Sequence, residues 1–436
     1  MSDGSSGILE RLFALTANGT TVRTEILAGI TTFLTMAYII FVNPSILAQA
    51  GMDFGAVFVA TCIAAAAGSL IMGLYANYPV ALAPGMGLNA YFAFTVVPQF
   101  GGDWRLALGC VFLSGIAFLA LSLSPLREWL VNAIPRSLKY GIGAGIGYFL
   151  ALIGLQNAGI VTAHPVTLVT LGNLGAHGAL LAMAGFVALV ALYFRRVPGA
   201  IMLTIIGVTA AAVLLGLQPL QGVVDMPPSL APTLFEMNIR GAFEIGFVTI
   251  IFVFLLVDLL DTTGTLVSVG QRAGMVDEDG KLPRLRKAMV ADSTATAIGA
   301  ALGTSTTTSY IESTAGIETG GRTGLMAVTV GVLFLASLFL APLAGTVPAY
   351  ATAPALVFVA CLMARSLADI SWDDITEAVP AMVTALAIPL TYSISSGIGL
   401  GIIAYAGIKL ASGRWRDLNW AIALIAAAFA VKLALQ

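Results

Sequence analysis

Fourteen apolar segments follow one another along this chain, and their length is the strongest constraint on its fold. A helix needs about 20 apolar residues to cross the hydrocarbon core of a bilayer. Segments of that order lie at 26–48, 55–76, 79–97, 105–123, 136–156, 178–194, 199–216, 242–270, 285–302, 303–318, 323–341, 346–364, 375–392 and 396–411. A further apolar stretch, 418–435, is either an extra span or a helix that lies against the bundle. The sequence therefore predicts an all-α polytopic membrane protein.

The composition agrees with a chain that lies mostly within a membrane. Only 10% of the 436 residues are charged, whereas a soluble domain carries about 25%. The 47 glycines favour close helix packing in lipid. A net charge of −2 indicates no nucleic-acid partner. The three cysteines, Cys62, Cys110 and Cys361, lie in apolar runs and indicate neither a metal site nor a disulfide framework. No cofactor is expected.

The basic residues predict the orientation. With a cytoplasmic N-terminus and fourteen crossings, 18 of the 20 Lys and Arg residues fall on the cytoplasmic side if Lys432 stays inside, and only Arg105 and Arg240 lie opposite. This bias is what the positive-inside rule requires of a correct topology. We therefore expect an integral protein of the inner or plasma membrane with its N-terminus in the cytoplasm.

The spans divide into two halves. The proline-rich connection 218–240 separates seven spans from seven, and an odd number of crossings per half inverts the second half relative to the first. Transporters built from such inverted repeats place their site at the repeat interface and use interrupted helices in matching positions. The sequence therefore predicts a seven-plus-seven inverted repeat.

The third span of each half is interrupted. In the first half, Pro84, Gly85 and Gly87 break the helix just before Asn89. In the second half, six hydroxyl residues at 304–309 precede Glu312. Irregular backbone at membrane depth persists only where protein buries it or where it lines a wet cavity. We expect two helix starts to face each other across a polar pocket; the alternative is a proline kink satisfied by neighbouring hydroxyls.

Carboxylates also occur within the spans of the second half. Asp258, Asp261 and Thr265 are spaced so that they share one face of the eighth span, and Asp292 lies in the ninth. A carboxylate at the bilayer centre costs about 2.5–3.5 kcal/mol on the milder scales, so it indicates a functional site. The alternative is structural: Asp258 and Asp261 can cap neighbouring helix ends, and Asp292 can pair locally with Ser293 and its hydroxyl neighbours.

Other polar residues carry weaker signals. Thr31, Thr32 and Thr35 give the first span a polar face that suits either a pocket or packing. His164 and His177 lie in an outer connection, where solvated histidines are expected.

Three motifs together resemble the AzgA-like purine permeases of the nucleobase–ascorbate transporter superfamily. They are Ala83-Pro-Gly-Met-Gly-Leu-Asn-Ala-Tyr-Phe92, Asp261-Thr-Thr-Gly-Thr265 and Thr308-Ser-Tyr-Ile-Glu-Ser313. The resemblance extends over nearly the whole chain. It implies short antiparallel strands in spans three and ten, a core domain at 26–123 and 242–341, and a gate domain at 125–216 and 346–411, with 418–435 as an extra C-terminal hydrophobic helix.

The resemblance also implies a function. It is proton-symport import of adenine, guanine or hypoxanthine by an elevator movement of the core past the gate, with a possible homodimer formed through the gate. Asn89, Asp261 and Glu312 match the family's substrate-contacting residues. Around them we expect Gly87, Thr265, Tyr310 and Ile311 at the base, and Asp261, Glu312, Asp258 and Asp292 in proton coupling. The preferred purine and the choice of proton or sodium stay open.

Purine chemistry fits these residue types. Carboxylates accept hydrogen bonds from ring N–H and exocyclic amino groups, and backbone N–H groups donate to ring nitrogens and oxygens. Relatives that carry uracil or xanthine usually have a Glu where Asp261 stands, and the shorter side chain suits a two-ring base.

Three alternatives differ in what they require. A same-fold transporter of an inorganic anion requires a cationic group or bare helix ends, whereas this site collects carboxylates. A membrane-embedded enzyme requires a nucleophile–base pair or a metal cluster in the spans, which the sequence does not offer. A channel requires a polar stripe along several spans, whereas here the polar residues gather near the middle of spans three, eight and ten.

Overall fold

The computed structural model describes residues 7–124, 134–244, 248–275 and 282–434. These residues form two compact units, each described here by itself. The first unit comprises 1–93, 97–124 and 188–348, and the second comprises 94–96, 125–187 and 349–436. The first unit thus includes α11 (Ala200–Leu214), which packs on α2 (Val22–Met36), although we assigned this segment to the gate. The core and gate boundaries stay a prediction.

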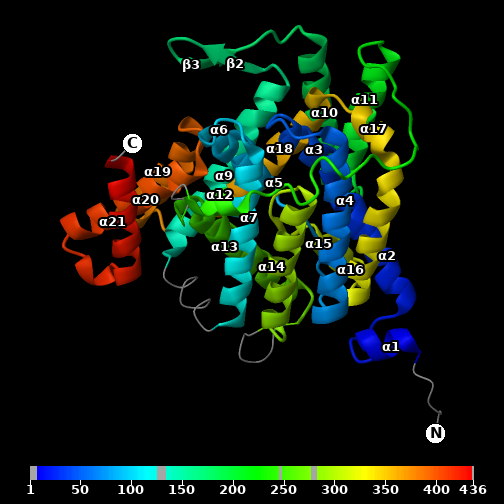
Figure 1. Ribbon diagram of the computed structural model, residues 1–436, viewed down its shortest axis with the longest axis horizontal. Coiled ribbons are helices and arrows are strands. Elements are labelled where there is room, and N and C mark those ends of the chain that lie inside the picture. The colour runs from blue at the N-terminus through cyan, green and yellow to red at the C-terminus, as the bar shows by residue number, and fades with distance from the viewer. Residues whose placement is uncertain (1–6, 125–133, 245–247, 276–281, 435–436) are drawn as a thin grey trace. The chain divides into compact units, whose positions relative to one another are not determined.

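The first unit is built from the helices of both sequence halves (Figure 1). Besides α2 and α11, it contains α1 (Ile8–Phe13), α3 (Ile39–Ala48), α4 (Phe54–Ile71), the π-helix Met72–Ala76, β1 (Leu82–Pro84), α5 (Met86–Tyr91), α6 (Val97–Gln99), α7 (Trp104–Leu123), α12 (Ile239–Glu244), α13 (Val248–Arg272), α14 (Leu285–Leu302), β4 (Thr307–Ser309), α15 (Ser313–Glu318), α16 (Gly324–Ala336), the 3-10 helix Ser337–Leu340 and α17 (Ala341–Thr346). A further π-helix, Phe92–Val96, follows α5 and passes from the first unit into the second.

The second unit comprises α9 (Arg136–Asn157), β2 (Val161–His164), β3 (Leu168–Leu171), most of α10 (His177–Phe194), α18 (Ala349–Ala364), the 3-10 helix Arg365–Asp369, α19 (Ile375–Leu390), α20 (Ile394–Ala411), the 3-10 helix Trp415–Asp417 and α21 (Trp420–Ala434). Helix α9 packs against α18 and α19. The approach is close because Gly141 lies against the backbone of Ala381, where a Cβ would overlap the carbonyl group. Helix α21 packs on α20, and whether it crosses the membrane stays a prediction.

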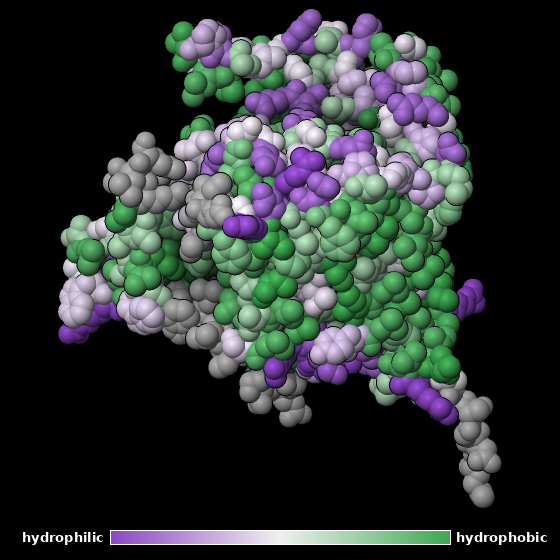
Figure 2. All heavy atoms as spheres, in the orientation of Figure 1, coloured by the Kyte–Doolittle hydropathy of each residue, from purple (hydrophilic) through white to green (hydrophobic). Residues whose placement is uncertain are grey.

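The membrane-protein class is confirmed. Within the described ranges, nine helices are long and apolar enough to span a bilayer. The other five predicted segments are the two interrupted ones, the short helices α11 and α19, and α14, which carries Arg286, Lys287 and Asp292. In Figure 2 the outer faces of α7, α14, α4 and α16 are mostly hydrophobic, with hydrophilic residues toward the helix ends.

The backbone groups left unpaired by the breaks in spans three and ten form hydrogen bonds with each other. Strands β1 and β4 pair antiparallel, with Leu82 opposite Ser309 and Pro84 opposite Thr307. The ladder continues because Gly85 N donates to Thr306 O at 2.9 Å and Tyr310 N donates to Ala81 O at 3.0 Å. The predicted antiparallel strands are therefore confirmed. Backbone groups that lipid could not pair are paired across the two sequence halves.

A buried glutamate fixes the first span against the eleventh. Glu25 on α2 is fully buried, and its carboxylate accepts N–H bonds from Arg322, Thr323 and Met326 at 2.8, 3.3 and 3.2 Å. These groups lie at the start of α16, where unpaired donors and the positive end of the helix dipole favour a carboxylate. The contact holds α2 beside the element that follows the second interrupted span.

Candidate functional site

All nine predicted site residues lie in the first unit, on elements next to the paired strands. They are Gly87 and Asn89 on α5, Asp258, Asp261 and Thr265 on α13, Asp292 on α14, and Tyr310, Ile311 and Glu312 between β4 and α15. Helices α13 and α14 both contact β4, whereas α5 follows β1 after a single residue. The interrupted spans therefore bring polar residues from four separate segments together.

Two of the four carboxylates belong to residues that keep accessible surface. Asp261 is exposed and Glu312 is half-buried, and the two carboxylates lie close enough to interact electrostatically. Ile311, next to Glu312, is 44% exposed. We call Asp261 and Glu312 the open pair. Two accessible carboxylates side by side can accept hydrogen bonds from a neutral ligand that presents N–H groups.

A tyrosine from the first span supports the open pair. The Tyr38 hydroxyl donates to Glu312 Oε1 at 2.8 Å. Tyr38 lies in the short connection from α2 to α3, and its side chain is fully buried. The Thr35 hydroxyl lies 3.5 Å from the Glu312 carbonyl oxygen. Sequence reasoning missed Tyr38, although the polar threonines just before it in the first span were a signal. A hydroxyl donor to a carboxylate fixes its rotamer and leaves its second oxygen for a ligand.

The other two carboxylates form a buried pair, Asp258 and Asp292. Asp292 accepts from Thr262 at 2.8 Å and from Ser309 at 2.7 Å. Asp258 accepts from Thr296 at 3.1 Å, and this hydroxyl also lies 2.9 Å from the Thr307 carbonyl oxygen. Asp258 is 1% exposed and Asp292 0%. The buried pair thus holds β4 between α13 and α14, and its part in proton coupling stays a prediction.

Asp258, Asp261 and Thr265 all lie on α13, so the spacing that places them on one helical face is present, but their exposure differs. Asp258 and Thr265 are buried at 1% and 8% exposure, whereas Asp261 is exposed. Residues three apart on a helix differ by about 60° around its axis, which is enough to cross from a packed face to an open one. Asp292 likewise bonds to Thr262 and Ser309 on other elements, so its local pairing is not what the structure shows.

Asn89 and Tyr310 are buried and tie the interrupted spans together. The Asn89 Oδ1 atom accepts a hydrogen bond from the Ser305 hydroxyl, whereas the Asn89 Nδ2 atom has no hydrogen-bond partner among the described residues. Tyr310 is 6% exposed and donates to the Pro84 carbonyl oxygen at 2.6 Å. Gly87, the second residue of α5, is half-buried. An unpaired buried amide requires a ligand, a water or a rearrangement.

The expected helix starts are present. Helix α5 begins at Met86, within the predicted range, and α15 begins at Ser313 directly after Glu312. Neither N-cap residue, Gly85 or Glu312, caps its helix with a side-chain hydrogen bond. At the start of α15, Ser313, Thr314 and Ala315 already donate to the carbonyls of the preceding turn at 3.2, 3.0 and 3.0 Å. The first-turn N–H groups of α5 are therefore the candidate donors.

Comparison with known proteins decides the family. Residues 23–400 match the permease family. The chain belongs to this family. The permease is 48% identical to the adenine permease AdeP of Escherichia coli, over 98% of this chain and 96% of that protein. It is 46% identical to the guanine/hypoxanthine permease PbuO of Bacillus subtilis, over 97% of this chain and 99% of that protein. The resemblance to the AzgA-like permeases is confirmed, and the protein is not an enzyme.

The fold of the permease has a solved counterpart. The transmembrane domain of the cyanobacterial bicarbonate transporter BicA superposes with a TM-score of 0.68 at 16% identity, covering 86% of this chain and 97% of that one. At that identity the likeness shows the fold alone. The predicted fold, a seven-plus-seven inverted repeat with short strands in spans three and ten, is confirmed.

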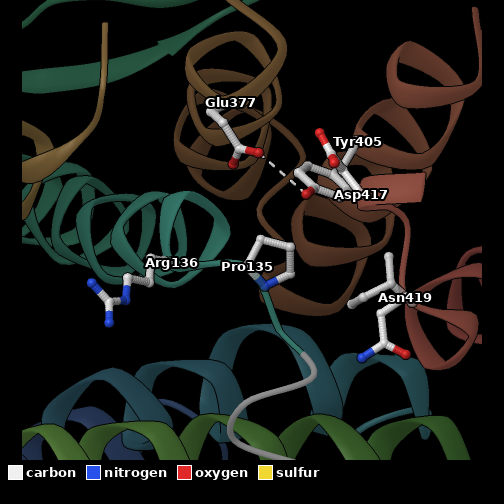
Figure 3. A pocket seen from close by; sticks show the side chains of 7 residues that line it. Pro135, Arg136, Glu377, Tyr405, Asp417 and Asn419 are labelled. Carbon is white, nitrogen blue, oxygen red and sulfur yellow. Dashed lines mark hydrogen bonds between the residues drawn. The ribbon is translucent and has the colours of Figure 1, made fainter. Parts of the chain in front are cut away.

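The second unit of the permease contains a separate polar cavity of about 290 Å³ (Figure 3). It is lined by Pro135, Arg136, Glu377, Tyr405, Asp417, Asn419 and Ile422. Behind it, the fully buried Lys409 pairs with Glu377 at 2.7 Å, and Tyr405 donates to the same carboxylate at 3.2 Å. These charges satisfy one another and include none of the predicted site residues, so we assign the cavity a structural role.

Asp417, which lines that cavity, also belongs to a group of three charged residues at the surface. Arg414 pairs with Asp374 at 2.7 Å and with Asp417 at 2.9 Å. Hydrogen bonds from the Thr376 hydroxyl and from Arg414 lower the pKa of Asp374 to about 2. Asp374 is also the N-cap of α19, where its side chain accepts from Thr376 N at 3.0 Å.

Proposed function

We propose that this permease imports purine nucleobases, namely adenine, guanine or hypoxanthine, and that the open pair binds the base. The observation that carries the proposal is the placement of Asp261 and Glu312: both are accessible, and they lie beside the two interrupted spans. The purines named for the relatives from Escherichia coli and Bacillus subtilis support the substrate class.

The chemistry of the base matches the groups around the open pair. A purine is planar and carries ring N–H and exocyclic amino donors, which the two carboxylates accept. Its ring nitrogens accept from backbone N–H groups at the start of α5. Such a site rejects a molecule that leaves its buried polar groups unpaired, because each unpaired group costs about 1–3 kcal/mol.

Proton symport follows from the cost of moving charge through the membrane. A carboxylate in the hydrocarbon region costs about 2.5–3.5 kcal/mol, and protonation removes that charge. In the proposed cycle, Asp261 or Glu312 takes a proton from the outside, the base binds, and both are released in the cytoplasm. Asp258 and Asp292 are the further candidates for proton coupling, and sodium in place of the proton is the alternative ion.

The two compact units support an elevator mechanism. We propose that the first unit, which contains every predicted site residue, carries the base while the second unit stays fixed in the membrane. The N-terminus is placed in the cytoplasm on the positive-inside bias of the sequence. A homodimer formed through the second unit is part of the same proposal.

Uptake measurements test the substrate and the ion. The permease is expressed in a strain without nucleobase permeases, and uptake of labelled adenine, guanine, hypoxanthine, xanthine and uracil is measured at acidic and alkaline external pH. We expect purine uptake that rises at acidic pH and collapses with a protonophore. Preference for uracil overturns the purine class, and preference for xanthine overturns the assignment to adenine, guanine or hypoxanthine. Uptake that does not depend on pH but requires sodium overturns proton coupling.

Purified permease in liposomes separates transport of a neutral base from anion transport. With an internal pH-sensitive dye, addition of the preferred purine acidifies the lumen if a proton accompanies the base. Sulfate and bicarbonate are tested in the same vesicles as the alternative substrates of this fold. Anion uptake without purine uptake contradicts the proposal.

A further inference from the structure

The connection between α9 and α10 has an unusual composition for a segment outside the membrane. Both helices are long and apolar enough to span a bilayer, so residues 158–176 leave the membrane and return to it on one side. No Asp, Glu, Lys or Arg occurs anywhere from residue 140 to residue 194. By contrast, the connection 365–374 in the same unit contains Arg365 and three aspartates.

This connection folds into a hairpin that exposes aliphatic side chains. Strands β2 and β3 pair antiparallel, and Figure 1 shows them extending away from the helices. Val166, Leu168 and Leu171 are 82%, 72% and 66% exposed, and Val169 is 44% exposed. A two-stranded hairpin is marginally stable in water unless another layer covers its apolar face.

The two faces of the hairpin differ. Val161 lies opposite Leu171 and Ala163 opposite Val169, so all four side chains occupy one entirely apolar face. The other face carries the pairs Thr162–Thr170 and His164–Leu168. The division follows strand alternation and gives the hairpin an apolar face and a more polar one.

The turn holds its apolar side chains in a fixed position. His164 Nδ1 lies 2.9 Å from the Thr167 hydroxyl and accepts from Thr167 N at 3.1 Å. Leu168 has a φ of 67°, a conformation that favours Gly or Asn over a leucine. The Leu168 side chain is 72% exposed and lies opposite His164, on the more polar face.

We infer that the β2–β3 hairpin lies in the lipid headgroup region, with its apolar face (Val161, Ala163, Val169 and Leu171) and the tip residue Val166 inserted toward the acyl chains. Lipid is the partner that fits. The hairpin begins and ends at membrane-spanning helices, it carries no charge, and its apolar face offers only aliphatic side chains. A protein-binding surface is instead enriched in Trp, Tyr, Arg and Met.

The hairpin fixes the second unit in the membrane. Its base is anchored because Gly172 N donates to Ile160 O at 2.8 Å and Ile160 packs on the cluster Ala158, Ala182 and Ala353 of the same unit. Insertion of the tip then links the bilayer surface to α9, α10 and α18. The inference does not depend on the transported substrate.

Spin-label accessibility tests the inference on the full-length permease in phosphatidylethanolamine–phosphatidylglycerol liposomes. A nitroxide is attached to Val169→Cys or to its neighbour Thr170→Cys, in a Cys361→Ser background. Cys361 is the exposed cysteine of the chain, and Cys62 and Cys110 are buried. Val187→Cys on α10, 69% exposed, is the lipid reference, and Asp373→Cys is the water reference.

We expect the label at 169 to be more accessible to oxygen, like that at 187, and the label at 170 to be more accessible to a water-soluble nickel chelate, like that at 373. Equal access of the nickel chelate to 169 and 170 overturns the inference. Spin–spin broadening at 169 that disappears on dilution with unlabelled permease also overturns it, in favour of contact between two copies. Base uptake by each labelled variant shows that the protein is folded.

Discussion

The open pair and the buried pair contain the same kind of group in the same unit, but their surroundings differ. Asp292 accepts from hydroxyls of α13 and β4 with both of its oxygens. Asp258 accepts from Thr296 of α14, and its other oxygen is buried without a partner among the described residues. Asp261 and Glu312 are accessible, and the structure gives Glu312 one side-chain donor, Tyr38. A carboxylate within a membrane span is therefore not by itself a binding site. Its free acceptor positions and its accessibility decide the role.

The largest expected effect comes from neutralising the open pair. Glu312→Gln and Asp261→Asn keep the shape of each side chain but replace one acceptor oxygen with a donor. A hydrogen bond to a charged group contributes about 1.5–3 kcal/mol, so purine uptake is expected to fall about 10- to 100-fold or more. Uptake of labelled base, normalised to the amount of permease in the membrane, measures the loss.

Glu318→Gln is the matched control for that comparison. Glu318 ends the same short helix that Glu312 precedes, and it pairs with Arg272 at 2.8 Å on the surface, with 67% of its side chain exposed. Uptake by this variant is expected to stay near the wild-type level. Equal losses at positions 312 and 318 contradict the assignment of the open pair as the binding site.

Disruption of the buried pair is expected to act first on stability. Asp292→Ala leaves the hydroxyls of Thr262 and Ser309 without their acceptor, and a buried unsatisfied group costs about 1–3 kcal/mol. The melting temperature of the purified permease should fall by several degrees, and that of Asp261→Ala should change less. A variant at 292 with wild-type stability and no uptake indicates instead that Asp292 takes part directly in transport.

Removal of the Tyr38 hydroxyl is expected to have a smaller effect on the open pair. Tyr38→Phe deletes one donor to Glu312 and keeps the ring packing. The apparent affinity for the base should weaken about 10-fold, because a hydrogen bond to a carboxylate is lost. Concentration-dependent uptake measures it. If Tyr38 served only as packing, the phenylalanine variant would match the wild type in both affinity and maximal rate.

The smallest effect is expected at a carboxylate outside the membrane region. The pKa of Asp374 is lowered from 3.8 to about 2, so its contribution to stability is complete above the unfolded value and is lost only as pH falls toward 2. Asp374→Asn should therefore lower the melting temperature slightly, by the same amount across about pH 5 to 8. A difference that varies across this range means that another titrating group responds to the substitution.

The interrupted spans show which features of the site could be predicted from the sequence. Proline, glycine and a run of hydroxyls at 84–87 and 304–309 break a helix for local reasons, so the two breaks and the start of α5 could be predicted. The paired strands were expected from the family resemblance alone. The acidic spacing in α13 could not decide exposure, because the packing of α14 and β4 determines which side of that helix is covered. Asn89 fits this pattern: a buried polar residue was expected beside the break, but its pairing with Ser305 depends on tertiary packing.

By itself, the sequence determined the membrane class, the positions of the spans and the two breaks, because hydrophobic length and backbone chemistry act within a single segment. Only the tertiary structure decided which carboxylates stay open. Tyr38 meets Glu312 across 274 positions of sequence, and Glu25 meets the start of α16 across about 300. Such contacts depend on how distant helices pack, and no local pattern records that packing.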